Sequence, residues 1–136
     1  MAASSVEEFD DHLNGVDCDS RVRTIVSTLR SHINACGPVT WLAHKSKHSW
    51  GIRASVAGRI VCRMDPKPVG GYVAVQVMDA QPADLAAAGG VYLRKDAPPW
   101  AHVADTGAVA VLLPLIDRAC ATAKGRATAA RGATTR

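Results

Sequence analysis

The stretch that decides the fold is Ile52-Arg-Ala-Ser-Val-Ala-Gly-Arg-Ile-Val-Cys-Arg-Met64, where apolar and polar residues alternate on both sides of Ala57-Gly58. Alternation with a period of two is typical of a half-buried strand, and a glycine between two such runs predicts a hairpin. A two-residue loop would bring arginines onto the apolar face, whereas a three-residue loop, Ala57-Gly58-Arg59, keeps the apolar residues together. We therefore expect the second register. Its pairs are Val56–Ile60, Ala54–Cys62 and Ile52–Met64.

This register has a consequence for the polar face of the hairpin. It places Arg53 directly opposite Arg63, and like charges at opposing positions are mildly destabilising in a sheet. Two long side chains can separate into water, which costs little. Alternatively, both guanidinium groups can bind one anion, such as a phosphate. The sequence leaves both interpretations open.

The rest of the chain alternates between helical and strand periodicity. Ser5-Val-Glu-Glu8 has the form of a capping box and predicts a short helix to about Leu13. Apolar residues at helical spacing from Val22 to Ile33 predict a longer helix that stops at Gly37-Pro38. Beyond the hairpin, the expected elements are strands at Val39–Leu42, Tyr72–Met78, Val91–Leu93 and Trp100–Ala104, a short helix at Ala83–Ala88, and a last helix from Asp105 or Thr106 to Ala123.

Helices at both ends of a run of strands predict an α+β fold, with an antiparallel curved sheet of about 4–5 strands and the N-terminal and C-terminal helices on one face. We expect three regions along the chain. Residues 1–20 form an acidic N-terminal segment with a short helix, and residues 21–123 form a single α+β domain. Residues 124–136 contain no large apolar residue, which predicts a disordered basic tail.

Composition excludes several classes of protein. With 48% hydrophobic and 21% charged residues, the chain is neither disordered, nor collagen-like, nor a coiled coil. No uninterrupted apolar run approaches the roughly 20 residues of a membrane helix, and no basic-then-apolar secretory signal opens the sequence. None of the four cysteines is paired at C-x-x-C spacing, which favours reduced thiols and a cytoplasmic location. The bias toward Arg, Ala and Val is typical of a high-GC bacterial genome.

The charge is unevenly distributed along the chain. The first 20 residues contain no lysine or arginine, and no acidic residue occurs between Arg21 and Met64. A basic surface of this kind is either a solvated face, partly neutralised by the acidic N-terminus, or a site for an anionic partner.

The basic stretch also contains two of the three tryptophans, Trp41 and Trp50. Basic side chains neutralise phosphates and an exposed indole stacks on a base, although the two indoles could equally anchor the core. The leading interpretation is a small non-catalytic module that contacts RNA, DNA or a nucleoprotein such as the ribosome. Its candidate binding residues are Arg21, Arg23, Lys45, Lys47, Trp50, Arg53, Arg59 and Arg63.

Motifs for other chemistry are absent from the sequence. It has no Gly-rich phosphate loop, no G-x-S-x-G and no H-E-x-x-H. His44 and His48 have metal-ligand spacing, but the two lysines between them oppose a cation, so we expect no metal. No cofactor and no catalytic residue are predicted. Two alternatives remain: a ligand-binding or enzymatic pocket that uses His44, His48 or His102, and a surface for a protein partner.

Several short motifs resemble known bacterial families. Ser5-Val-Glu-Glu-Phe9, Gly37-Pro38-Val39, Lys47…Trp50-Gly-Ile-Arg53 and Trp100-Ala-His102 are similar to the YdhG-like domains of unknown function, in particular an actinobacterial branch. From Gly71 onward, Pro82-Ala-Asp-Leu85 and Tyr92-Leu93 also resemble the MmcQ/YjbR-like family. The resemblance covers about residues 5–123 and implies a small curved sheet after two helices. YjbR-like folds have been likened to a double-winged DNA-binding arrangement, which implies a nucleic-acid partner by analogy of fold. The resemblance implies no catalytic residue.

Overall fold

In a computed structural model, the structure describes residues 6–14, 19–45, 50–67, 70–93 and 98–134, with only the backbone described for residue 12 and residues 127–134. In chain order, the elements are α1 (Val6–Asn14), α2 (Ser20–Asn34), β1 (Thr40–Lys45), β2 (Trp50–Val56), β3 (Arg59–Lys67), β4 (Tyr72–Val77), α3 (Pro82–Leu85), β5 (Gly90–Tyr92), β6 (Trp100–Val103), the 3-10 turn η1 (Thr106–Ala108) and α4 (Val109–Thr134).

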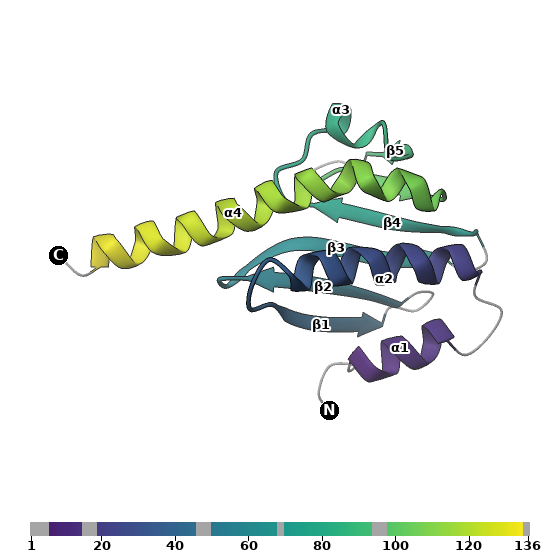
Figure 1. Cartoon of the computed structure of the whole chain (residues 1–136), viewed down its shortest axis with the longest axis horizontal. Helices are drawn as coiled ribbons and strands as arrows, with labels where there is room; N and C mark the ends of the chain where they lie inside the picture. The colour runs from purple at the N-terminus through teal and green to yellow at the C-terminus, as the bar shows by residue number, and fades with distance from the viewer. Residues whose placement is uncertain (1–5, 15–18, 46–49, 68–69, 94–97, 135–136) are drawn as a thin grey trace.

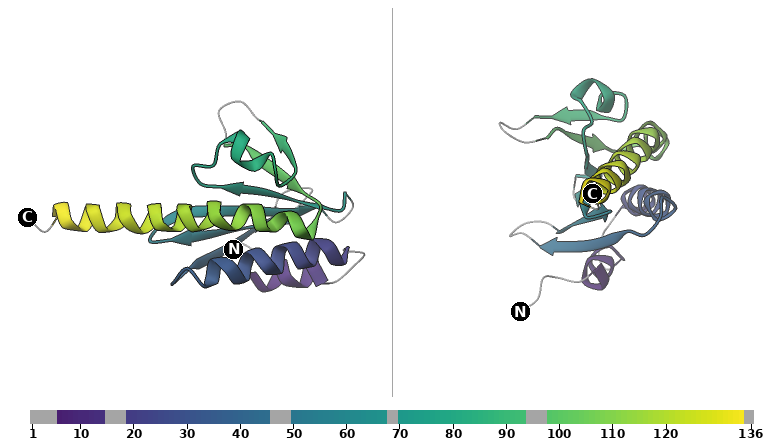
Figure 2. Two further views of the ribbon diagram at one scale, coloured as in Figure 1. Left: turned by 45° about the horizontal axis from the view of Figure 1, so that its top comes forward. Right: turned by 90° about the vertical axis from the view of Figure 1, so that its left-hand side faces the viewer.

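The strands form one antiparallel sheet in the order β1-β2-β3-β4-β6-β5. Helices α1, α2 and α4 lie on the same face of this sheet (Figures 1 and 2). The expected α+β class is confirmed. The described sheet has six strands rather than four or five, because the short strand β5 pairs with β6 at the edge.

The hairpin that decides the fold has the predicted pairing over most of its length, but a different turn. Ile52 lies opposite Met64, as expected, whereas Val56 lies opposite Arg59 rather than Ile60. Ala57 and Gly58 both have positive φ, 51° and 81°, which is the conformation of a two-residue type I′ turn.

A β-bulge reconciles the tight turn with the predicted faces. The register shifts next to Ala54, where Val61 is the extra residue on β3. On the side of the bulge away from the turn, the two strands pair as they would with a three-residue loop. Arg53 therefore lies opposite Arg63. The extra residue, Val61, is buried. The hydrophobic pattern therefore sets the register, and the bulge absorbs the shorter turn.

The acidic N-terminal helix belongs to the domain. Phe9 on α1 is fully buried and Leu13 is 5% exposed, and both join the single hydrophobic core. The carboxylate of Asp10 pairs with Arg30 on α2. Helix α1 therefore supplies apolar residues to the same core as the region that the sequence predicted to begin at residue 21.

Helix α4 continues past its expected end. It runs to Thr134, although the sequence predicted a helix ending at Ala123 and a disordered tail after it. Alanine, lysine and arginine dominate this extension, and all three have high helix propensity, so helix continues where the apolar stripe has ended. Lys124 also contacts the carbonyl of Cys36 and ties the start of the extension to the end of α2.

The part of α4 over Thr106–Arg126, with η1, is long and apolar enough to cross a membrane, with a mean hydropathy of 1.4. The criterion of an uninterrupted apolar run does not detect this segment, because charged residues interrupt it. In the fold, Leu112 and Ile116 of this helix are fully buried in the core. A core helix passes the same test, so this composition is weak evidence for a membrane.

Candidate nucleic-acid interface

The two faces of the sheet differ in what covers them. One carries the core under α1, α2 and α4, whereas none of the described helices packs on the other (Figure 2). We call this second surface the open face. The strand alternation and register give its principal side chains as Leu42, His44, Arg53, Ser55, Arg63, Asp65, Lys67, Tyr72, Gln76, Tyr92, Trp100 and His102.

Two arginines meet at the centre of the open face. Arg53 on β2 lies opposite Arg63 on β3, which in turn lies opposite Gln76 on β4. Both arginines are half-buried, and within the described chain neither has a hydrogen bond or an ion pair. Two arginines at directly opposite positions, with no ion pair in the described chain, can bind one phosphate together.

Aromatic rings lie on the same face, on the strands next to β3. The His102 ring stacks on Tyr72, with 4.6 Å between centroids and 29° between planes. Tyr92 lies 5.8 Å from the same imidazole. The three rings come from the neighbouring strands β4, β6 and β5. Together they form an aromatic row of the kind on which bases stack.

A groove of about 430 Å³ adjoins Arg63. It forms where the bulge bends β3 and where Gln76 Nε2 donates a hydrogen bond of 2.9 Å to the Pro98 carbonyl. Trp100 is part of its wall. The groove is large enough for a single base or a small ligand. It is lined by residues 60–63, residues 76–79, Pro98 and Trp100.

A carboxylate and an imidazole lie on the other side of the arginine pair. His44 Nε2 is 3.7 Å from Asp65 Oδ1. Burial raises the pKa of Asp65, and the nearby His44, Lys67 and Arg63 charges oppose this effect without cancelling it. Oδ1 is buried and has no hydrogen-bond partner within the described part of the chain. Asp65 is therefore a strained carboxylate on an otherwise basic surface.

This environment predicts a pH-dependent stability. Because the folded-state pKa of Asp65 is raised, its favourable contribution exists below the ordinary aspartate pKa and is lost as pH rises through the raised value. Asp65→Asn removes the charge and keeps the shape. We expect urea unfolding to give a higher midpoint for this variant than for the parent at pH 7, and equal midpoints at about pH 3. Asp11→Asn, on the exposed side of α1, should change neither; a less stable Asp65→Asn protein at pH 7 contradicts the assignment.

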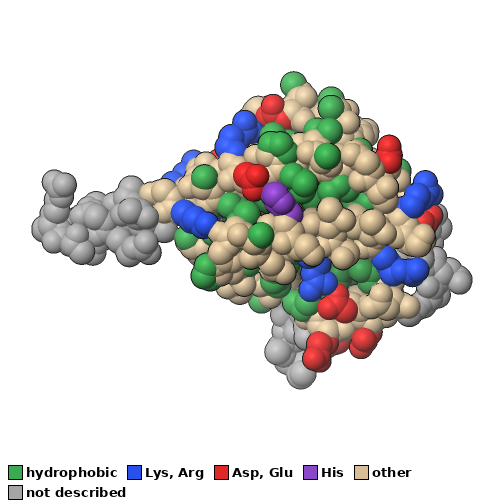
Figure 3. Space-filling view, viewed as in Figure 1, with side chains coloured by type: hydrophobic (Ala, Val, Ile, Leu, Met, Phe, Trp, Pro, Cys, Tyr) green, Lys and Arg blue, Asp and Glu red, His purple; other side chains and the backbone are tan. Residues whose placement is uncertain are grey.

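The helix-covered side carries charges of both signs. Lys and Arg side chains alternate there with Asp and Glu (Figure 3). The pairs are Arg21–Asp19, Arg30–Asp10, Arg118–Asp84 and Arg126–Asp79. The hydrogen bonds that the Arg21 side chain donates to the Asp19 carboxylate lower the pKa of Asp19 and raise that of Arg21. These cations are thus already neutralised by the protein.

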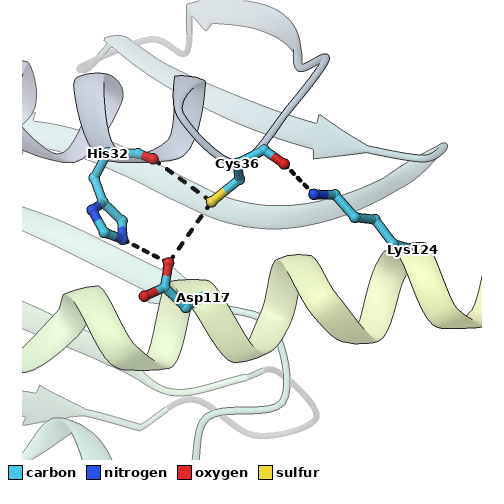
Figure 4. A network of polar contacts seen from close by, with 4 residues as sticks. All are labelled: His32, Cys36, Asp117 and Lys124. Carbon is cyan, nitrogen blue, oxygen red and sulfur yellow. Dashed lines mark hydrogen bonds and ion pairs between the residues drawn. The ribbon is translucent and has the colours of Figure 1, made fainter.

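A polar network joins α2 to α4 on the same side (Figure 4). His32 Nε2 is 2.7 Å from Asp117 Oδ1, and the Cys36 thiol lies 3.8 Å from the same oxygen. Burial raises the pKa of Cys120 and of Cys62 to about 12, so both thiols are protonated at neutral pH and are poor nucleophiles. Within the described residues, no three His, Cys, Asp or Glu side chains are arranged to hold a metal ion. The network connects helix α2 to helix α4.

The structure divides the candidate residues that the sequence singled out. Arg53 and Arg63 come together on the open face, and Arg59 is exposed beside the turn of the same hairpin. Arg21 and Arg23 lie on α2, on the opposite side of the sheet. Lys47 and His48 lie outside the described residues.

Trp50 is not on the open face. It packs partly buried against the core, with the Lys45 ammonium 5.4 Å from its ring. Trp41 also packs against the core, and its indole donates a 2.8 Å hydrogen bond to Asn34. The alternative interpretation, in which the two indoles anchor the core, fits these positions. The structure does not bring His44 and His102 into one pocket either, because they lie on strands β1 and β6.

Several residues of the open face were not among the candidates. Tyr72, Gln76, Tyr92 and Trp100 lie on the open face. For Tyr72 and Gln76 the signal was present in the sequence, because both alternate with the valines of β4 that are buried in the core. The residues that alternate with buried positions on each predicted strand, considered together, indicate which side chains share the open face.

Comparison of the chain with protein-family models found no matching family, and comparisons with curated proteins and with solved structures found no match. The resemblance to YdhG-like and YjbR-like domains therefore stays a prediction.

Proposed function

We propose that the protein binds single-stranded nucleic acid, RNA in particular, across the open face of its sheet. The observation that carries this proposal is the Arg53–Arg63 pair, which has no ion pair or hydrogen bond within the described chain. The cations of the helix side differ, since aspartates pair with several of them.

The neighbouring groups favour a single strand over a duplex. Base faces are accessible only in unpaired nucleotides, and the Tyr72–His102–Tyr92 row offers rings on which they stack. Lys67 follows Arg63 at a spacing of four residues on the same face of β3, or roughly 13 Å. The cations therefore extend along a line that a phosphate backbone can follow.

The test is fluorescence anisotropy with a labelled 12-nucleotide single strand and with a duplex of the same sequence, at several salt concentrations. With the arginine pair neutralising one phosphate and Lys67 a second, log Kd should change with log salt with a slope of about 1.4 for the single strand. We expect the duplex to bind at least about tenfold more weakly, since it conceals its base faces. Equal binding of both, or no dependence on salt, contradicts the proposal.

A further inference from the structure

The His44–Asp65 pair lies on the proposed binding surface, yet binding a strand does not require it. The His44 side chain is 46% exposed, whereas Asp65 is 19% exposed. An exposed imidazole backed by a more buried carboxylate is the arrangement in which the carboxylate orients the ring and the ring accepts a proton. A separation of 3.7 Å is longer than a hydrogen bond, but such contacts are often long until substrate is bound.

The backbone is adapted to this pair. Gly51 on β2 lies between the two side chains, and a Cβ atom there would be 2.1 Å from Asp65 Oδ1 and 2.6 Å from His44 Nε2. Only a glycine at position 51 of β2, the strand between β1 and β3, leaves room for the His44 and Asp65 side chains to approach each other. Because Oδ1 is buried without a hydrogen bond in the described chain, the arrangement costs stability. Groups kept at such a cost are typical of functional sites.

The pair is also well placed relative to the arginines. Gly51 is two residues from Arg53 on β2, and Asp65 is two residues from Arg63 on β3. Two residues of strand span about 7 Å. When the arginines hold one phosphate, the ribose attached to that phosphate can therefore lie over His44.

We propose that the open face cleaves the RNA strand it binds, with His44 as the general base; this rests on the proposed RNA-binding function. With Nε2–H directed at Asp65, His44 Nδ1 takes the proton of a ribose 2′-hydroxyl. The 2′-oxygen bonds to the adjacent phosphorus as the bond from phosphorus to the 5′-oxygen breaks. Water protonates the leaving oxygen, and the imidazolium returns its proton to the resulting hydroxide. The products are a 2′,3′-cyclic phosphate and a 5′-hydroxyl, and no oxidant or reductant is consumed.

The other groups have supporting roles in this step. Arg53 and Arg63 stabilise the charge that develops on the phosphate oxygens. Asp65 is a positioning residue, because it acts through His44 and does not touch the reacting atoms. The reaction needs a 2′-hydroxyl, so DNA should bind without being cut.

The test uses the full chain with a labelled 12-nucleotide single-stranded RNA, in parallel with the 2′-O-methyl form of the same strand. We expect cyclic-phosphate ends, identified by mass spectrometry, from the RNA alone. His44→Gln should lower the cleavage rate by at least about 100-fold and leave Kd within twofold. Asp65→Asn should lower kcat and leave KM unchanged, because Asp65 positions the His44 ring and does not contact the strand. Asp11→Asn, purified identically, should leave the rate and Kd unchanged.

The outcomes separate the two proposals. Binding of RNA without cleavage, or cleavage by His44→Gln at the parent rate, overturns the catalytic role and leaves the binding function intact. An Asp65→Asn variant with the kcat of the parent, or one that changes only KM, overturns the positioning role. Failure to bind the 2′-O-methyl strand and the RNA alike overturns both proposals.

Discussion

Replacing Arg53 and Arg63 together by glutamate is expected to weaken binding of single-stranded RNA by at least about 100-fold, since each charged hydrogen bond lost costs about 1.5–3 kcal/mol. The two side chains lie opposite each other on the open face and have no competing ion pair in the described chain. The salt dependence should fall as well, with a slope smaller by about 0.7, because the phosphate that the pair neutralises is no longer held. Anisotropy titration at several salt concentrations measures both quantities.

A matched control variant distinguishes an effect at the Arg53–Arg63 pair from an effect of the protein's net charge. Arg21→Glu with Arg118→Glu changes the total charge by the same amount, but both residues lie on the helix side in ion pairs with aspartates. We expect the control to keep its affinity within about threefold. Equal losses in the two double variants would mean that RNA responds to overall charge and not to the open face.

The second large effect concerns stability. Phe9→Ala is expected to lower the free energy of unfolding by about 3–5 kcal/mol, the usual cost of removing a buried phenylalanine ring. The Phe9 side chain is fully buried in the core between α1 and the sheet. Urea unfolding followed by circular dichroism measures the change.

The control for this variant is on the same helix. Asp11→Ala removes an exposed side chain of α1 and should change stability by less than about 0.5 kcal/mol. A Phe9→Ala protein as stable as the parent would mean that α1 does not contribute to the hydrophobic core.

The central part of the fold could be predicted because one rule decides it. Apolar residues of a hairpin must share a face, so the pairing of Arg53 with Arg63 followed from parity alone. The turn could not be predicted in the same way. The hairpin can have either a two-residue turn with a bulge at Val61 or a three-residue loop. Both place the residues from Ala54 back to Ile52 on the same faces of the sheet, so the alternation of apolar residues does not distinguish them.

The candidate site was only half predicted. A charge count along the sequence grouped Arg21 with Arg53, although α2 and β2 place them on opposite sides of the sheet. Ion pairing between distant segments, such as Asp84 with Arg118, also depends on packing that composition does not contain. The aromatic row required the order β4-β6-β5, in which the last strand of the chain inserts between two earlier ones.

The most direct test of the central claim is a titration of isotope-labelled protein with single-stranded RNA, followed by amide chemical shifts. If the open face binds the strand, the largest shifts fall on Arg53, Arg63, Gln76 and His102, and residues on the exposed side of α2 stay unchanged. Shifts concentrated on α2 around Arg21, or none on β2, β3, β4 and β6 while RNA is bound, would contradict the account.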